Sequence, residues 1–418
     1  MKFFKWLYPG MGVKRWILLC GTGITVIVFE ALFAIRLFSK SSILLASFAT
    51  GVLIFGIFLI ITSIKHMLRT FVRALMPKDQ GELVNIVYRQ RRERFLQRGP
   101  HVVVVGGGTG LSVLLQGIKT HTNNITAIVT VTDTGGSSGR LRDEFDMLPP
   151  GDIRNCLVAL ADAEPLMGEL FQYRFEDGSG LKGHSFGNLF ITALSKITGD
   201  FDRAIKESSK VLAIRGRVIP STLEKVSIVG EFEDGQIIEG ETNITEVKKP
   251  LKRVTLKPAH CQAAKEAVEA LQSADLIVLG PGSLFTSILP NLLIREIADI
   301  ITASDAYKVY VSNIMTQPGE TDNLTTAGHL NALVQHTNPR IVDVCVVNNG
   351  GIPKELLDKY AEQNSSTVAL DVGEVTKNGY EIIEGDIVKV DTTVRHDPHK
   401  LAKVIFDKFI EHGIKNEA

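Results

Sequence analysis

Two long apolar stretches lie near the start of the 418-residue chain. Trp16–Ile35 is interrupted only by Glu30, and Ser41–Ile64 contains no charged residue. Each is near the roughly 20 residues that a helix needs to cross a bilayer. A cleaved signal peptide would have a shorter apolar region and no second span. The pattern predicts two transmembrane helices forming a hairpin within residues 1–66. Glu30 is then either a functional acid or a carboxylate at the interface or in a helix pair.

Positive charges flank both apolar stretches. Four Lys or Arg residues precede the first stretch and three follow the second, whereas the link between the stretches is short. The positive-inside tendency then places both ends in the cytoplasm. Residues 67–98 interleave arginines with apolar residues, which suits a basic juxtamembrane helix on anionic lipid or a solvated linker helix. We expect a two-span protein of the inner (cytoplasmic) membrane with a soluble cytoplasmic domain.

From Gly99 onward, short apolar runs typical of buried strands alternate with helical patterns. The expected strands are 101–105, 125–131, 274–279, 308–312 and 341–347, and the expected helices are 109–119, 152–161, 184–197, 201–213 and 398–412. This alternation predicts an α/β domain over residues 99–418, with a doubly wound, Rossmann-like, mostly parallel sheet. Residues 218–254 break the rhythm with short alternating runs and turn signals, and predict a small β-hairpin insertion.

Composition excludes several classes of protein. The 46 basic and 46 acidic residues sum to zero net charge, so no nucleic-acid partner is expected. The balance hides an asymmetry, because residues 1–98 hold 15 Lys or Arg against 4 Asp or Glu, and the remainder 31 against 42. A membrane-binding front and a separate soluble body explain this split. The four cysteines are far apart without a C-x-x-C pair, which indicates a reducing compartment.

A glycine-rich loop follows the first predicted strand of the body. It contains Gly107, Gly108, Thr109, Gly110 and Ser112, and it leads directly into a predicted helix. Backbone N–H groups at a helix start suit a phosphate, and glycines let that phosphate approach. The third glycine of the dinucleotide fingerprint and the lysine of a P-loop are both missing. We therefore predict a nucleotide or sugar phosphate site, with a tight structural turn as the alternative.

A second glycine-rich loop follows the next strand and opens on the same edge of a parallel sheet. It contains Asp133, Gly136, Ser137, Ser138 and Arg140. Asp133 is a candidate for binding a ribose hydroxyl or a divalent metal ion, for catalysis, or for capping the turn. Arg140 is either a fork for phosphate or a surface charge. The two loops together predict a ligand pocket.

Two predicted helix starts carry dense polar sets. Asp152 stands where a helix N-cap would lie, with Asn155 one turn later, and Asp152 is a candidate for catalysis or capping. His184, Ser185 and Asn188 open another helix. His184 is a candidate acid, base or phosphate ligand near neutral pH, or a residue that satisfies a backbone carbonyl.

A later strand repeats the strand, glycine loop and helix order. Gly280, Gly282 and Ser283 form the second candidate phosphate loop. The polar residues of 313–321 and 348–349 also follow strands. Their amides are candidates for reading a base or sugar, or for stabilising turns.

Taken together, the motifs at 106–112, 133–140, 150–155, 184–188 and 280–287 resemble the bacterial YvcK-like gluconeogenesis factor family. That family shares a superfamily with CofD, a transferase that moves a 2-phospho-L-lactate group onto a deazaflavin. The resemblance implies binding of UDP-sugars, notably UDP-N-acetylglucosamine, and a role in cell shape and wall synthesis during gluconeogenic growth. It implies no secure catalytic reaction.

The resemblance also brings two late residues into the expected pocket. Tyr360 would stack on uracil or the sugar, and Arg395 would clamp the diphosphate. Without the family, Tyr360 reads as a packing residue. The apolar front of the chain departs from the usual soluble members of the family.

Two functions are therefore expected from the sequence. The first is a membrane-tethered, non-catalytic UDP-sugar-binding regulator, forming a homo-oligomer and acting with membrane lipid and cell-wall synthesis proteins. The second is a CofD-like transferase of a phospho-lactyl-type group, for which Mg²⁺ would be the cofactor. The failed dinucleotide fingerprint weakens a third function, an oxidoreductase.

Overall fold

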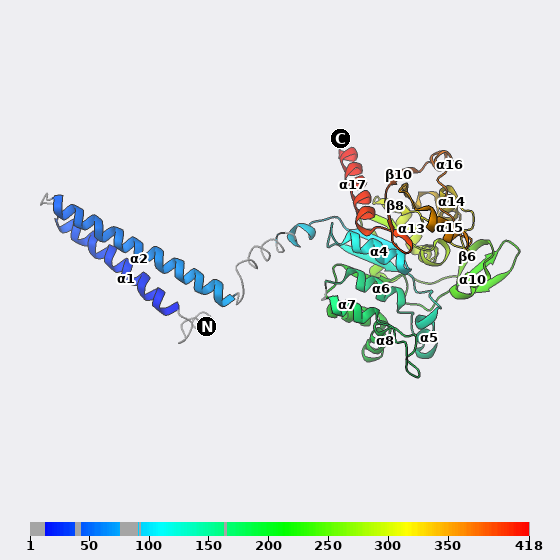
Figure 1. Ribbon diagram of the computed structural model, residues 1–418, viewed down its shortest axis with the longest axis horizontal. Coiled ribbons are helices and arrows are strands. Elements are labelled where there is room, and N and C mark those ends of the chain that lie inside the picture. Colours follow the sequence, from blue (N-terminus) through cyan, green and yellow to red (C-terminus); the bar gives the residue numbers. More distant parts are fainter. Residues whose placement is uncertain (1–12, 38–42, 76–90, 92, 163–164, 418) are drawn as a thin grey trace. The chain divides into compact units, whose positions relative to one another are not determined.

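The computed structural model describes residues 13–37, 43–75, 91, 93–162 and 165–417. The chain divides into two compact units, residues 1–91 and residues 92–418. Figure 1 shows the helical first unit and the α/β second unit. Each unit is described by itself below.

The first unit is a pair of helices, α1 (Val13–Leu37) and α2 (Ile43–Leu75). Their segments Arg15–Phe33 and Ser47–Arg69 are long and apolar enough to cross a membrane, and most of their side chains are exposed. The helices approach closely at two glycines. A Cβ on Gly23 would lie 2.9 Å from Ile60, and one on Gly56 would lie 2.7 Å from a side-chain carbon of α1. Small residues at this crossing let the two backbones meet.

The second unit is built on a seven-stranded sheet in which every neighbouring pair is parallel. The strand order is β10-β9-β8-β7-β1-β2-β3. The strands are β1 (Val102–Gly106), β2 (Ile125–Val129), β3 (Arg217–Pro220), β7 (Leu276–Leu279), β8 (Tyr307–Val311), β9 (Val344–Asn348) and β10 (Glu381–Gly385). The order reverses between β1 and β7, which makes this pair the switch point of the sheet. The predicted Rossmann-like fold is confirmed.

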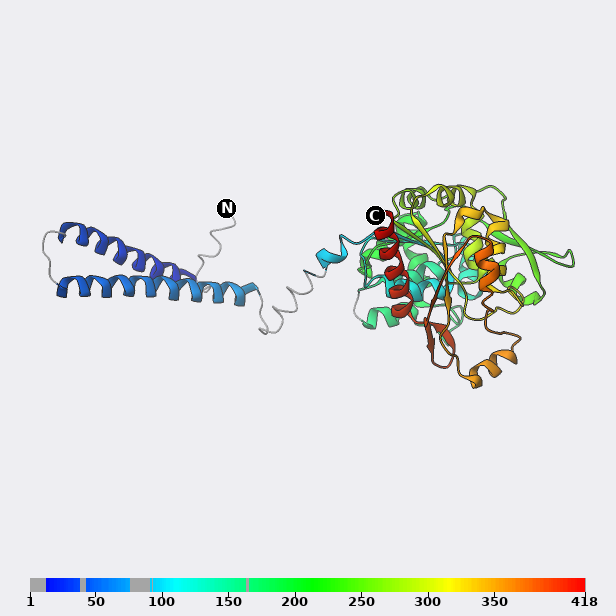
Figure 2. The same cartoon turned by 90° about the horizontal axis from the view of Figure 1, so that it is seen from above.

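Helices cover both faces of this sheet, and β1 therefore buries its residues alternately on the two sides. Val103 and Val105 pack in one core with α11 (Lys265–Gln272), α13 (Arg295–Ala303) and α14 (Thr326–His336). Val102 and Val104 pack in a second core with α4 (Gly108–Ile118), α6 (Gly151–Leu160) and α17 (Pro398–Glu417). Figure 2 shows α17 in red along the body. The helices expected at 109–119, 152–161 and 398–412 are therefore present.

The remaining helices lie mainly in the connections. They are α5 (Gly136–Phe145), α7 (Pro165–Gln172), α8 (Phe186–Thr198), α9 (Phe201–Val211), α12 (Leu289–Leu292), α15 (Lys354–Ala361) and α16 (Val372–Lys377), with a π-helical turn at Leu284–Ile288 and a 3-10 turn at Pro339–Ile341. The π-helical turn directly follows the second candidate phosphate loop. Such turns are frequent at functional sites.

The predicted insertion is present, but its start was wrong. Arg217–Pro220 is β3, an edge strand of the central sheet. The insertion proper is a three-stranded antiparallel sheet of β4 (Ser227–Phe232), β5 (Ile237–Glu239) and β6 (Leu251–Lys257), with α10 (Glu241–Val247) between the last two. Phe232 and other apolar residues of this sheet join the main core, so the insertion is packed onto the body.

A second small hairpin was not expected from the sequence. It pairs β11 (Val388–Val390) with β12 (Val394–His396), just before α17. The start of the body also lies before Gly99. Leu96 is 2% exposed, and its carbonyl accepts a hydrogen bond from the backbone N–H of Asn123.

Candidate functional site

The two candidate phosphate loops lie against each other at the switch point. Strands β1 and β7 are parallel neighbours, so the loops after them open at the same carboxyl edge. A Cβ on Gly110 would lie only 2.6 Å from the carbonyl oxygen of Pro281 in the other loop. Between these loops and the segment 313–318 lies a cleft of about 510 Å³. Gly107, Gly282 and Ser283 line it.

The first loop presents backbone donors rather than a side-chain cap. Gly108 has a φ of +65°, a conformation that favours glycine, and it starts α4. The cap position, Gly107, has no side chain to satisfy the N–H groups of the first turn. The hydroxyl of Ser112 donates to the carbonyl of Thr109 within the helix, at 2.7 Å. A helix start without a side-chain cap, such as this one, is the type of site at which anions bind in other proteins.

The second candidate phosphate loop, which follows β7, is hydrogen-bonded to the opposite wall of the cleft. The hydroxyl of Ser283 donates to Gln317 Oε1 at 2.8 Å and lies 3.2 Å from Glu320 Oε1. Thr286 donates to the same carboxylate oxygen at 3.3 Å. Glu320 is 6% exposed, and burial raises its pKa to about 7. These bonds fix the loop on the segment that supplies the amides of the cleft.

Tyr360 both lines the cleft and packs. Its ring contacts the small apolar cluster formed by Ile314, Val388 and Val394. Its hydroxyl accepts a hydrogen bond from the backbone N–H of Val394 at 3.0 Å. The hydroxyl thus holds β12 next to the cleft, and the neighbouring Arg395 lines the cleft as an exposed side chain.

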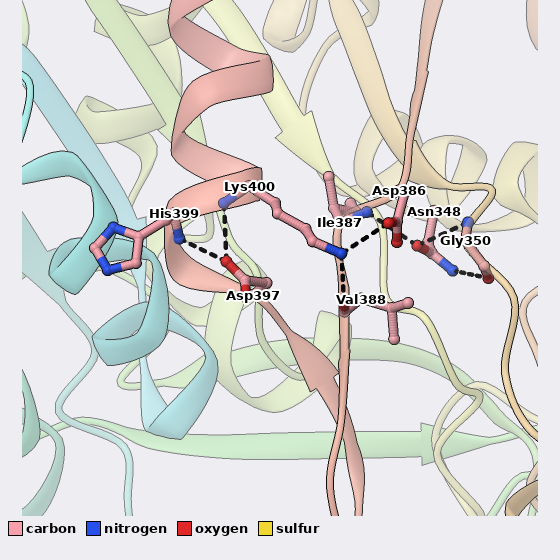
Figure 3. Close-up of polar contacts among 8 residues, drawn as sticks. All are labelled: Asn348, Gly350, Asp386, Ile387, Val388, Asp397, His399 and Lys400. Atoms are coloured by element: carbon pink, nitrogen blue, oxygen red, sulfur yellow. Dashed lines mark hydrogen bonds and ion pairs between the residues drawn. The ribbon is translucent and has the colours of Figure 1, made fainter.

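A polar network fixes the base of the hairpin that carries Arg395 (Figure 3). Lys400 in α17 binds Asp386 at 2.7 Å. Asp397 Oδ1 accepts from the backbone N–H groups at the start of α17, including that of Lys400, at 2.9 Å. Asn348 Oδ1 accepts from the N–H of Ile387 at 3.2 Å. The network joins the ends of β9 and β10 to α17, so Arg395 is presented from an anchored element.

The glycine loop after β2, at 135–140, is held by hydrogen bonds to residues at the start of α8. The hydroxyl of Ser137 lies 2.9 Å from His184 Nδ1, and Asn188 Nδ2 donates to Ser137 at 3.1 Å. Ser185 caps α8 by accepting from the N–H of Asn188, and it also accepts from Arg154. Apart from Arg154, these side chains are at most 4% exposed. They line neither the cleft nor the second cavity described below.

Other predicted residues also lie away from the cleft lining. Arg140 donates to the carbonyl of Lys182 at 2.9 Å. Ser138 is 4% exposed, and a Cβ on Gly136 would meet open space. A Cβ on Gly280 would lie 2.9 Å from a side-chain carbon of the π-helical turn, so this glycine allows close packing.

Carboxyl groups gather behind the first loop. Asp152 accepts from the N–H of Gly108, and burial, followed by the charge of Asp133, raises the pKa of Asp152 to about 6. Burial and the charges of Asp133, Asp152 and Glu320 raise the pKa of Glu241 to about 9. Glu241 therefore carries a proton at neutral pH. The sequence analysis missed Glu241 and Glu320, because only the fold brings them near the loop.

Two expectations about these acids are settled by geometry. Asp152 is not the N-cap of α6, because Pro150 occupies that position and Asp152 lies in the first turn. Asp133 does stabilise its turn, since its Oδ1 accepts from the N–H of Gly135 at 2.7 Å. Within the described ranges, no three His, Cys, Asp or Glu side chains converge to hold a metal ion.

A second cavity of about 610 Å³ adjoins the cleft. The two share Thr109, Val113, Arg395 and His396 in their linings. Ser112 and Asn155, which the sequence analysis assigned to the phosphate pocket, line this second cavity and not the first.

The comparisons with known proteins agree with this architecture. Residues 102–388 match the family model described as 2-phospho-L-lactate transferase CofD. A putative gluconeogenesis factor from Clostridium acetobutylicum is 42% identical to the chain, covering 98% of the chain and 93% of the relative. The gluconeogenesis factor of Bacillus subtilis is 48% identical, covering 74% of the chain and 98% of the relative. The chain belongs to the gluconeogenesis factor family, and its body is a CofD-type domain.

A solved structure shows the same body. It is a protein from Bacillus halodurans, described as a member of the UPF0052 family, and it is 48% identical with a TM-score of 0.73. It covers 74% of this chain and 100% of its own. The solved Bacillus halodurans chain is therefore a folded relative that matches this chain over its own whole length. The Clostridium relative and a Nostoc relative that covers 97% of the chain extend over the first unit as well.

Proposed function

We propose that this protein is a membrane-tethered regulator that binds a UDP-sugar, UDP-N-acetylglucosamine, and controls cell shape, wall synthesis and growth on gluconeogenic carbon sources. The observation that carries the proposal is the contact between two glycine loops at the switch point. Together with Arg395 they surround one cleft of about 510 Å³. Family membership, taken with the residue types of this cleft, supports the nucleotide-sugar as ligand.

The diphosphate is assigned to the floor of the cleft. Thr109 and Gly110 offer backbone N–H groups in the first turn of α4, at the positive end of the helix, where an anion is stabilised, whereas the N–H of Gly108 is donated to Asp152. Arg395 is the one Lys or Arg among the described residues that line the cleft. Its planar fork suits two phosphate oxygens. Asp152 and Glu320 do not line the cleft, and the raised pKa values of Glu320 and Glu241 reduce the negative charge behind the loop.

The uracil and the sugar are assigned to the walls of the cleft that Tyr360 and the segment 313–318 form. Tyr360 offers a ring face for stacking, and Asn313 and Gln317 offer amides that read hydrogen-bonding edges. Gln317 is already oriented by Ser283 and by Asn313 Nδ2, which donates to Gln317 Oε1 at 3.3 Å. Pre-oriented polar groups favour a specific ligand over a generic phosphate.

The membrane tether is assigned to the first unit. Its two helices carry the apolar segments Arg15–Phe33 and Ser47–Arg69, with mostly exposed apolar side chains. Exposed apolar surface of this extent is unfavourable in water and favourable in lipid. The tether would place a UDP-sugar sensor where lipid-linked wall precursors are made. Full rescue of cell shape by residues 92–418 alone, in cells that lack the full chain, would show that the tether is dispensable.

A CofD-like transferase is the alternative, and the match of residues 102–388 to the transferase family favours it. A transferase needs an acceptor cavity beside the donor and an acid or base at the reacting atoms. The adjoining 610 Å³ cavity offers space for an acceptor. Asp133, Asp152 and His184 line neither cavity, which favours the non-catalytic function.

Calorimetric titration of residues 92–418 with UDP-N-acetylglucosamine, GDP and NAD in parallel tests the proposal. We expect binding of UDP-N-acetylglucosamine with a dissociation constant in the micromolar range, about −8 kcal/mol, and weaker or no binding of the other two. Tight binding of NAD alone would overturn the assignment. Preferential GDP binding, with group transfer to a deazaflavin acceptor, would establish the transferase instead.

A further inference from the structure

A UDP-sugar in the cleft leaves the second cavity without an assigned ligand. We call this cavity the basic lobe. It is walled by α4, α6, the end of α7 and the β11–β12 hairpin, and has a volume of about 610 Å³. It meets the cleft at Thr109, Val113, Arg395 and His396. A molecule in the basic lobe would therefore lie next to a ligand in the cleft and share Arg395 with it.

The basic lobe has an excess of positive charge. Arg154, Lys389 and Arg395 line it, and Asp391 is the one Asp or Glu in the lining among the described residues. Asp391 binds Lys389 at 3.0 Å, and both side chains are more than half exposed. Arg154 is 9% exposed, and burial is the main cause that lowers its pKa. The carboxylates of Asp152 and Asp133 act in the opposite direction on Arg154, so the excess of positive charge in the lining comes mainly from Lys389 and Arg395.

The uncharged part of the lining is hydrogen-bonding rather than apolar. It consists of hydroxyl and amide side chains: Thr109, Ser112, Gln116, Asn155, Gln172, Thr392 and Thr393. Of the described lining residues, Val113, Ala159 and Pro398 are the apolar ones. Such a surface suits a ligand with several hydroxyl groups, and it does not suit an aromatic base or a lipid chain.

Two nitrogens in the walls have unused hydrogen-bonding capacity. Arg154 Nε and His396 Nε2 are buried and have no hydrogen-bond partner among the described residues. The two terminal nitrogens of Arg154 donate to Ser185 and Asn155. Both atoms are closed off from the cavity as the walls stand, so a ligand would pair with them only if these side chains turned toward it, and the charged and polar lining carries the inference.

We propose that the basic lobe binds a phosphorylated sugar or polyol at the same time as the cleft holds its nucleotide-sugar. The phosphate would lie between Lys389 and Arg395, and the hydroxyl groups would meet the amides and hydroxyls of α4 and α6. Because Arg395 and His396 face both cavities, occupancy of one would change affinity for the other. The proposal rests on the proposed function only for the identity of the ligand in the cleft.

Titration calorimetry on residues 92–418 tests the proposal with glucose 6-phosphate as the probe. The protein is first saturated with UDP-N-acetylglucosamine, and glucose and inorganic phosphate serve as partial ligands. The variant Lys389→Gln removes a charge that lines the basic lobe and not the cleft. Lys359→Gln is the matched control, because Lys359 is exposed and lines neither cavity.

We expect glucose 6-phosphate to bind the saturated protein and glucose not to bind. Lys389→Gln should weaken glucose 6-phosphate by about tenfold and UDP-N-acetylglucosamine by less than about twofold, while Lys359→Gln changes neither. No binding of glucose 6-phosphate or phosphate, or displacement of one ligand by the other, overturns the proposal. Equal weakening of both ligands by Lys389→Gln also overturns it. Failure of UDP-N-acetylglucosamine to bind refutes the proposed function alone, since the probe is also titrated into the free protein.

Discussion

Two glycine loops follow neighbouring strands at one edge of the same sheet, yet they have opposite surroundings. The loop after β1 faces a 510 Å³ cleft with the backbone of Thr109 and Gly110 in its lining, and no side chain caps its helix. The loop after β2 is exposed at Gly136 and Arg140, but its other side chains are tied down: Thr134 bonds to Thr242 of the insertion, and Ser137 bonds to the polar residues before and within α8. The surroundings supplied by distant segments, and not the glycines alone, decide whether such a loop faces a cleft.

The largest loss of ligand affinity is expected when the contact between the two loops of the cleft, after β1 and after β7, is disturbed. Gly110→Ala places a Cβ 2.6 Å from the carbonyl oxygen of Pro281, so one of the two loops must move. We expect the affinity for UDP-N-acetylglucosamine to fall about 100-fold or more, measured by calorimetry.

The matched change in the loop after β2 is Gly136→Ala. Its Cβ meets open space, but the φ of +47° costs about 1 kcal/mol of stability for a residue with a side chain. We expect the affinity to stay within about twofold of the wild type. Equal losses of affinity in the two variants would remove the distinction between the loops.

The next largest difference in affinity is expected between two arginines, Arg395 in the lining of the cleft and Arg140 at the loop after β2. Arg395→Gln removes the fork that lines the cleft, and the affinity for UDP-N-acetylglucosamine should fall roughly 10- to 100-fold with little change in stability. Arg140→Gln removes a bond to the carbonyl of Lys182, and the affinity should not change. Fluorescence-monitored competition binding measures both. A larger loss of affinity for Arg140→Gln would show that the phosphate binds at the loop after β2 and not in the cleft.

The loop after β2 should matter for stability instead. Ser137→Ala leaves the amide of Asn188 and the ring nitrogen of His184 without a buried partner, so the free energy of unfolding should fall by about 1–3 kcal/mol. Urea unfolding of residues 92–418 measures it. Ser273→Ala, at an exposed helix end, is the control and should change stability by less than about 0.5 kcal/mol. A stable Ser137→Ala protein with lost affinity would contradict this account.

The acids behind the loop after β1 make stability depend on pH. The pKa of Glu241 rises from 4.5 to about 9 in the folded protein, mainly through burial, so the unfolded chain releases this proton first. The contribution of Glu241 to stability is fully present below pH 4.5 and is lost as pH rises toward 9. Glu241→Gln should flatten this slope and stabilise the protein by about 1–3 kcal/mol at pH 9. Unfolding midpoints between pH 5 and pH 9 measure it, and an unchanged slope would place the carboxyl group in water.

Local patterns were sufficient to predict the elements of the fold. The apolar stretches of α1 and α2 and the alternation of strands and helices are periodic signals over many residues. The edge strand Arg217–Pro220 and the hairpin strands Val388–Val390 and Val394–His396 have only three or four residues each, too few to show a period. The predictions failed at short strands that include charged residues, whereas Leu276–Leu279, which is as short, was predicted because all its residues are apolar.

The site was only partly predictable for a different reason. The contact between the loops followed from the rule that ligands bind at the carboxyl ends of parallel strands. The bonds that hold the loop after β2 come from residues about 50 to 110 positions later in the chain. Burial raises the pKa of Glu241, and the charges of three carboxyl groups that are distant in sequence raise it further. Burial of this kind is set by tertiary packing and has no local signature.

Hydrogen–deuterium exchange of residues 92–418, with and without UDP-N-acetylglucosamine, tests the central claim most directly. The account predicts slower exchange at amides 107–112 and 282–284 when the ligand is bound, and no change at 135–140. Slowing confined to 135–140 and 184–188, with 107–112 unaffected, would contradict it.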